Sequence, residues 1–142
     1  MKRFRKGQGG FTLIELLIVI IIIGILAAIA IPMFLNQREK AKEAGVKEGV
    51  HSVQIGVETY AVDHNDMFPP AAQVGQGGAV GALVDIWPDN PFDNTPMAQA
   101  AANTEGDYTY AGVGAANAAG EFPGFTLSGW GANGTTAVIT VP

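Results

Sequence analysis

The hydropathy pattern of the chain begins with one long apolar run near the N-terminus. Across the 21 positions of residues 11–31, Glu15 is the only charged side chain and Thr12 is the only other polar one. A helix of about 20 apolar residues spans a bilayer core of about 30 Å. The run therefore predicts a membrane-spanning helix, which continues to residue 35 because residues 33–35 are apolar as well.

A second pattern follows with the spacing of an amphipathic helix. Its side chains recur at steps of four and three residues, which places them on one face of an α-helix. Residues 36–47 between the two patterns are rich in good helix formers. We therefore expect a single helix over residues 11–64, about 80 Å long at about 1.5 Å per residue. The stripe consists of Val46, Val50, Val53, Val57, Tyr60 and His64.

Proline and glycine interrupt this long helical pattern. Pro32 has no backbone N–H to donate and its ring clashes with the preceding turn, so it predicts a kink. Gly45, Gly49 and Gly56 lie off the stripe. They either let another part of the backbone approach closely or are simply tolerated.

The rest of the chain predicts loops and then strands. Residues 65–70 end the helix, residues 80–86 fit a short strand or a helical turn, and residues 87–96 fit an ordered loop pinned by Trp87 and Phe92. Three strands are expected over residues 107–113, 125–130 and 135–141, with Asn133-Gly134 as a hairpin turn between the last two. We predict an α+β fold in which a small antiparallel meander covers the helical stripe.

Charge is distributed unevenly along the chain. All eight Lys and Arg residues lie at or before Lys47, and four of them lie within residues 2–6. Basic residues beside a membrane span favour the cytoplasmic side, so the C-terminus is expected outside. A surface without Lys or Arg from residue 48 onward should repel phosphate, which argues against nucleic acid binding by the globular face. The chain has no cysteine, which excludes disulfides and thiol chemistry.

The first 30 residues have two simpler interpretations. Ala28-Ile29-Ala30 fits the cleavage site of a secretory signal peptide, but the apolar run before it is longer than usual and contains Glu15. A plain signal anchor would give Glu15 no special role.

The N-terminus resembles that of type IV prepilins and of the pseudopilins of type II secretion. The resemblance rests on a basic leader ending in Gly10, the sequence Phe11-Thr12-Leu13-Ile14-Glu15, and an apolar helix containing Gly24 and Pro32. It implies a class III signal peptide that prepilin peptidase cleaves between Gly10 and Phe11, followed by methylation of Phe11. It also implies four segments: a leader (1–10), a transmembrane and filament-core helix (11–35), an amphipathic helix (36–66), and a loop region with a C-terminal sheet (67–142).

The C-terminal half is similar to the major pseudopilin pattern, although more loosely. Residues 87–92, 107–110 and 125–134 correspond to a Trp-containing loop, a strand, and a second strand with its turn. The order of Trp, Pro and Asp differs from that pattern, Asn133 stands where an Asp is common, and the later acidic loop is absent.

The resemblance implies a structural subunit of a helical type IV pilus-like filament. Its expected partners are other copies of itself, prepilin peptidase, the membrane platform of the assembly machinery, and the lipid bilayer before assembly. Glu15 would pair with the Phe11 amine of a neighbouring subunit, and the segment from Gly24 to Pro32 would unwind on assembly. The subunit would lie in the cytoplasmic membrane first and in an extracellular filament afterwards. A major pseudopilin is one alternative, and a membrane-anchored monomeric binding module is another.

Little in the sequence indicates catalysis or a cofactor. No Ser/His/Asp set, phosphate loop or zinc spacing occurs, so we expect neither an enzyme nor a cofactor. His51 is expected to face solvent and His64 to cap the helix C-terminus. Asp85, Asp89 and Asp93 could offer oxygen ligands to calcium, although Asp and neighbouring Asn residues also build turns; we expect no metal.

Overall fold

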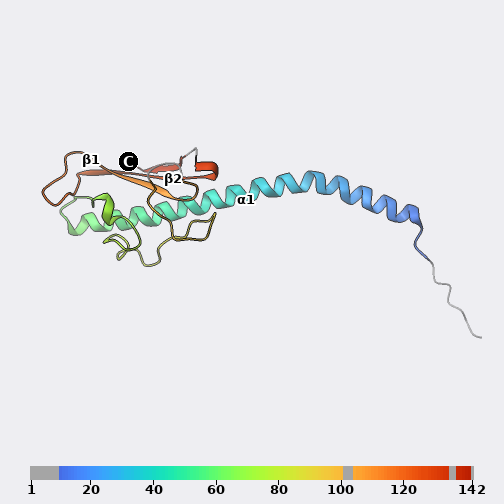
Figure 1. Ribbon diagram of the computed structural model, residues 1–142, viewed down its shortest axis with the longest axis horizontal. Helices are drawn as coiled ribbons and strands as arrows, with labels where there is room; N and C mark the ends of the chain where they lie inside the picture. The colour runs from blue at the N-terminus through green and yellow to red at the C-terminus, as the bar shows by residue number, and fades with distance from the viewer. Residues whose placement is uncertain (1–9, 101–103, 135–136, 142) are drawn as a thin grey trace, which may run out of the picture. The chain divides into compact units, whose positions relative to one another are not determined.

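The computed structural model describes residues 10–100, 104–134 and 137–141, and one long helix organises them. Helix α1 (Leu13–Asp63) runs from the blue to the green part of the chain in Figure 1. Its ends lie within two residues of the expected helix over residues 11–64, a difference typical of helix ends. The chain divides into two compact units between Gln37 and Arg38.

In the described residues of the N-terminal unit, 10–37, helix α1 is the only regular element. Its apolar side chains are exposed, and the segment is long and apolar enough to cross a membrane. The α-helical assignment continues through Pro32, which leaves the carbonyl of Ala28 without its usual donor four residues later. The expected kink and the loosening of this segment stay predictions.

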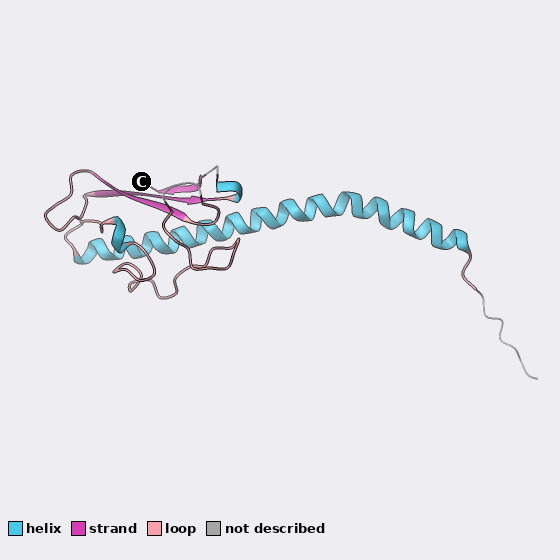
Figure 2. Cartoon of the chain, in the orientation of Figure 1, coloured by secondary structure: helices cyan, strands magenta, loops and turns pink. Residues whose placement is uncertain are grey.

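The second unit, Arg38–Pro142, contains the predicted antiparallel meander. Strands β1 (Tyr108–Val113), β2 (Gly124–Trp130) and β3 (Ala137–Val141) lie in the order β1-β2-β3. Tyr108 pairs with Gly129 in one ladder, and Leu127 pairs with Val141 in the other. The α+β fold is therefore confirmed, with a small sheet beside the C-terminal half of the helix (Figure 2).

The hairpin predicted between the last two strands is present, since β2 and β3 pair antiparallel, but the two-residue turn predicted at Asn133-Gly134 is wrong. Residues Ala132–Gly134 form the short 3₁₀ helix η2, closed by a bond from the Gly134 N–H to the Gly131 carbonyl (3.1 Å). A two-residue Asn-Gly turn needs a positive φ at both positions, and of these two residues Gly134 alone has one (60°). The ladder is already irregular at Gly129/Trp130, so the strands part before the Asn-Gly pair is reached.

The core lies where the sheet crosses the helical stripe. The valines of the stripe and Tyr60 are buried, as predicted from their spacing, and buried aromatic and aliphatic residues of the sheet pack against them. Alternate residues of β2 are buried, which is the pattern of a strand with one face on the core. The sheet residues of this cluster are Tyr108, Tyr110, Phe125 and Leu127.

The long connection between α1 and β1 adds the remaining core side chains. It contains the 3₁₀ helix η1 (Ala71–Gln73), and residues 80–86 form turns rather than a strand. Trp87 is buried and donates from Nε1 to the Met97 carbonyl (2.9 Å), so it pins its loop as expected.

Two helix glycines let this connection approach α1. A Cβ added at Gly49 would collide with Met97 Sδ and lie 3.1 Å from Pro88 Cβ. At Gly56 it would lie 2.6 Å from Val84 Cγ2 and 2.9 Å from Val80 Cγ1. Close approach, rather than mere tolerance, therefore accounts for both positions.

Candidate functional site

Helix α1 begins with a reciprocal pair of polar contacts between Thr12 and Glu15. The Glu15 backbone N–H donates to Thr12 Oγ1 (3.3 Å), and the Thr12 N–H donates to Glu15 Oε2 (2.9 Å). The Thr12 hydroxyl also donates to that oxygen (2.7 Å). This is a capping box, with Thr12 at the N-cap and Glu15 at the third helical position, and it satisfies N–H groups that the first turn leaves free.

The capping box also explains why one carboxylate is placed in an apolar run. A negative charge in the first turn is favoured by the helix dipole. Both contacts that Glu15 accepts use Oε2, and Oε1 accepts no hydrogen bond from the residues that the structure describes. The role of Thr12 was not predicted, although the Thr-x-x-Glu spacing before an apolar run signals it.

The residues just before the helix are accessible. Gly10 and Phe11 lie outside regular structure, and Phe11 is 87% exposed. A Cβ added at Gly10 would meet no atom within 4 Å. The peptide bond between them therefore lies in open, non-helical chain, where another protein can reach the backbone.

An exposed apolar surface extends along the helix after the capping box. Large aliphatic and aromatic side chains from Leu13 to Leu35 are each at least 46% exposed. Soluble monomers rarely leave so long an apolar surface in water. This segment therefore needs a lipid bilayer or the apolar surfaces of other helices around it.

The three candidate calcium ligands, Asp85, Asp89 and Asp93, all lie in the long connection between α1 and β1. Asp93 Oδ1 accepts from the Thr95 N–H (2.9 Å) and hydroxyl (2.7 Å), and these bonds lower the pKa of Asp93. Asp85 and Asp89 accept no hydrogen bond from other described residues. Within the described ranges, no group of three or more His, Cys, Asp or Glu residues is placed to hold a metal ion.

A buried asparagine organises the loop that carries these carboxylates. Asn90 Oδ1 accepts from the Phe92 N–H (2.8 Å), and its Nδ2 donates to the Glu105 carbonyl (2.9 Å). Lys42 of α1 lies over the Phe92 ring, 4.6 Å from its centroid. The loop is thus held by turn bonds and by the helix, as the turn-building interpretation predicted.

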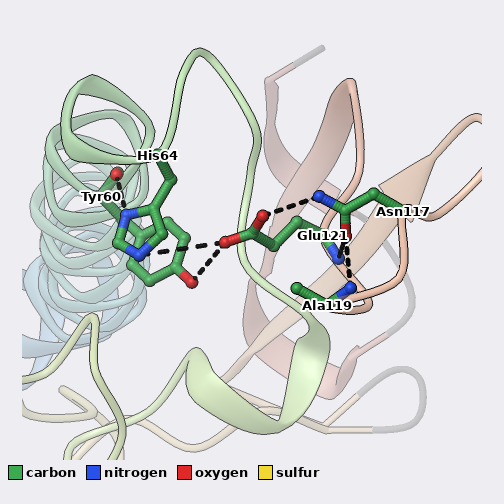
Figure 3. Close-up of polar contacts among 5 residues, drawn as sticks. All are labelled: Tyr60, His64, Asn117, Ala119 and Glu121. Carbon is green, nitrogen blue, oxygen red and sulfur yellow. Dashed lines mark hydrogen bonds and ion pairs between the residues drawn. The ribbon is translucent and has the colours of Figure 1, made fainter.

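Polar side chains gather where α1 ends, beside the connection from β1 to β2 (Figure 3). Glu121 Oε1 accepts from the Tyr60 hydroxyl (3.0 Å), and Oε2 accepts from Asn117 Nδ2 (2.8 Å). The Asn117 and Tyr60 bonds lower the pKa of Glu121, while burial and then the Glu121 carboxylate raise the pKa of Tyr60. A carboxylate held as an anion in this way ties the helix end to the sheet and is poorly suited to giving up or taking a proton.

Both histidines lie as the sequence predicted. His51 is exposed. The His64 ring places Nδ1 2.8 Å from the Tyr60 carbonyl oxygen, one of the last of the helix, and stacks on the Tyr60 ring at 3.7 Å. Its Nε2 lies 3.9 Å from Glu121 Oε1, which adds His64 to the same cluster.

Comparison with known proteins identifies the N-terminal segment. Residues 5–31 match the prokaryotic N-terminal methylation motif. This stretch contains Gly10, Phe11, Glu15 and Gly24.

Several known proteins are similar to this chain over about half of its length. It is 35% identical over 69 residues to type II secretion system core protein G of Pseudomonas aeruginosa, covering 49% of this chain and 48% of that protein. It is 36% identical over 75 residues to the type IV major pilin protein PilA of Myxococcus xanthus, covering 53% and 34%. It is 38% identical over 65 residues to competence protein ComGC of Halalkalibacterium halodurans, covering 46% and 64%.

The chain spans about half the length of the core protein G relatives that it matches. No solved structure matches it. The chain combines an N-terminal methylation motif with an exposed apolar helix and an α+β globular unit. These similarities support the family of type IV pilins and type II secretion pseudopilins. None of the relatives' names describes an enzyme.

Proposed function

We propose that the chain is the precursor of a structural subunit of a helical, type IV pilus-like filament. The observation that carries this proposal is the exposed apolar surface of α1 between residues 13 and 35. Before assembly the bilayer covers this surface, and the subunit spans the cytoplasmic membrane once with its C-terminus outside. After assembly the equivalent helices of neighbouring subunits replace the lipid.

Processing by prepilin peptidase is the first step of this proposal. Cleavage falls between Gly10 and Phe11, and the new amine of Phe11 is then methylated. The open, non-helical backbone at these two residues supports the assignment, because a peptidase must reach the bond that it cuts.

Glu15 then sets the position of each subunit in the filament core. Its carboxylate accepts from Thr12 through Oε2, which leaves Oε1 available to the Phe11 amine of a neighbouring subunit. In a core without water, a charge left without a partner is costly. A neighbour shifted by one helical turn would leave both charges unpaired, so the pair selects one register.

The filament is either a surface pilus or the pseudopilus of a type II secretion system. Similarity to core protein G supports the second, and similarity to PilA supports the first. In both, the membrane platform of the assembly machinery is the partner that extracts subunits from the bilayer. Deleting the gene distinguishes them: surface filaments disappear in the first case, and exported proteins remain inside the cell in the second.

Shearing and sedimentation without detergent test the proposal itself. Filaments of the full-length, processed protein should pellet from the sheared fraction, and mass spectrometry should find a mature chain that begins with methylated Phe11. A protein that stays with the membrane as a monomer would instead be an anchored binding module. A mature chain beginning at Ile31 would indicate ordinary signal-peptide cleavage after Ala30.

A further inference from the structure

An open apolar groove lies on the globular unit, beside helix α1. It has a volume of about 310 Å³ and is lined by Ser52 and Ile55 of α1 and by residues 83–86. Ile55 is 51% exposed and Ile86 is 81% exposed, so the walls of the groove are uncovered. Asp85 contributes a carboxylate to an otherwise mainly apolar lining.

The groove carboxylate has no partner within its own subunit. In residues 10–100, 104–134 and 137–141, the single ion pair joins His64 and Glu121. Asp85 is exposed and makes no hydrogen bond within these ranges. The sequence from residue 48 to 142 contains no Lys or Arg. A Lys or Arg of this chain that neutralises Asp85 must therefore come from the segment ending at Lys47.

The segment with the remaining cations has the complementary pattern. Phe34 and Leu35 are exposed, and Arg38 follows them at a spacing of four and three residues, on the same face of α1. Lys42 lies one turn after Arg38 in the helix. Because both side chains are cationic, Lys42 repels Arg38 rather than pairing with it. Arg38 forms no ion pair with any described residue.

We infer that the groove binds the Phe34–Arg38 turn of a second copy of this chain. Phe34 fills the apolar groove between Ile55 and Ile86, and Arg38 pairs with Asp85 at its wall. Arg38 of the same subunit is 14 residues before Ser52 in one helix, about 21 Å along the axis. It therefore cannot reach its own groove, and the contact joins different subunits.

Such a contact is heterologous, because the groove and its occupant are different surfaces of one subunit. A bound pair still presents one free groove, on one subunit, and one free Phe34–Arg38 turn, on the other, so binding can continue in one direction. Contacts of this type form rings or open helical filaments. The inference rests on the proposed filament function and assigns to it an interface outside the apolar core.

Charge exchange in full-length protein tests the contact. Asp85→Arg and Arg38→Glu should each lower the amount of sheared, sedimenting filament by about tenfold, because each leaves like charges opposed. The double variant restores opposite charges in reversed order and should recover most of the yield. The matched controls are Asp89→Arg and Lys40→Glu. Asp89 lies in the same connection but outside the groove. Lys40 lies about 200° around the helix from Arg38.

Cysteine cross-linking provides an independent measurement, since the natural chain has no cysteine. Filaments of the Phe34→Cys/Ile86→Cys double variant should give a ladder of disulfide-linked multimers on mild oxidation, and neither single variant should give one. The inference is overturned if the double charge variant gives no more filament than the single variants, or if Ile86→Cys cross-links to a different protein. In either case, wild-type filaments would still support the proposed function. Absence of wild-type filaments would instead refute the proposed function, and the inference with it.

Discussion

Adding one methyl group at Gly56 should destabilise the globular unit, although alanine is the better helix former. Replacing glycine by alanine inside a helix gains about 1 kcal/mol from backbone entropy. The new Cβ would lie 2.6 Å from Val84 Cγ2 and 2.9 Å from Val80 Cγ1, and Val80 is fully buried. Valine is stiff at χ1, so neither side chain turns away easily.

The size of the effect follows from these two opposing contributions. Overpacking a core costs about 1–3 kcal/mol, and two overlaps with stiff side chains belong to the upper part of that range. Subtracting the helix gain leaves a net loss of about 1–2 kcal/mol, or a Tm lower by about 5–10 °C for a unit of this size.

Gly45→Ala is the matched control for this variant. Its Cβ would lie 3.3 Å from Pro91 Cβ, a tight contact that a shift of a few tenths of an ångström relieves. Its Tm should therefore equal or slightly exceed that of the wild type, because the helix gain of about 1 kcal/mol is opposed only by this contact. Thermal unfolding of the full-length protein in detergent, followed by tryptophan fluorescence, to which buried Trp87 contributes, provides the measurement. A Gly56→Ala protein as stable as the wild type would show that the loop packs less closely on the helix than the structure indicates.

Four further predictions concern other parts of the chain. Glu15→Gln should be processed and inserted normally but should strongly reduce the yield of sheared filaments; wild-type yield would mean that the carboxylate is only tolerated. Gly24→Ala and Pro32→Ala should stiffen the helix by about 1 and 3 kcal/mol, respectively. Cryo-EM of wild-type filaments should show a loosened helix between these positions. An unbroken α-helix there would contradict the predicted unwinding on assembly. Hydrogen bonds lower the pKa of Glu121 in the folded state, so the folded protein binds this proton more weakly than the unfolded chain does. The stability that Glu121 contributes is therefore present at neutral pH and is lost as the pH falls below the usual carboxyl range. Glu121→Gln should flatten this part of the Tm–pH curve. Filaments should show no salt-sensitive DNA binding through the surface beyond Lys47, and a gel-shift titration that found it would refute the charge argument.

The sequence predicted those features that repeat at short range. The valine stripe has helical spacing, so the helix and its buried face followed directly from the order of residues. The alternation in β1 and β2 predicted two strands within one residue of their bounds. The two-residue turn predicted at Asn133-Gly134 does not form. The ladder between β2 and β3 ends at the pair Trp130 and Ala137, so Asn133-Gly134 lies in a longer connection where its local turn preference is overridden.

Features that join distant residues could not be predicted in the same way. Tyr60 and Glu121 are 61 positions apart, and their hydrogen bond exists only because the sheet folds back onto the helix. The groove beside Ile55 likewise forms only once residues 83–86 pack near the helix. In contrast, the Thr12 capping box is local and was visible in the sequence; it was missed because Glu15 was considered only as a charge in a membrane.

The capping box has a consequence for the removal of the leader. Its three hydrogen bonds involve Thr12 and Glu15 alone, and both residues lie after the proposed cleavage site. The start of the helix is therefore complete without anything that precedes Phe11. Removing residues 1–10 would then require no new folding at the membrane surface, so the subunit can enter assembly with the same helix start with which it entered the bilayer.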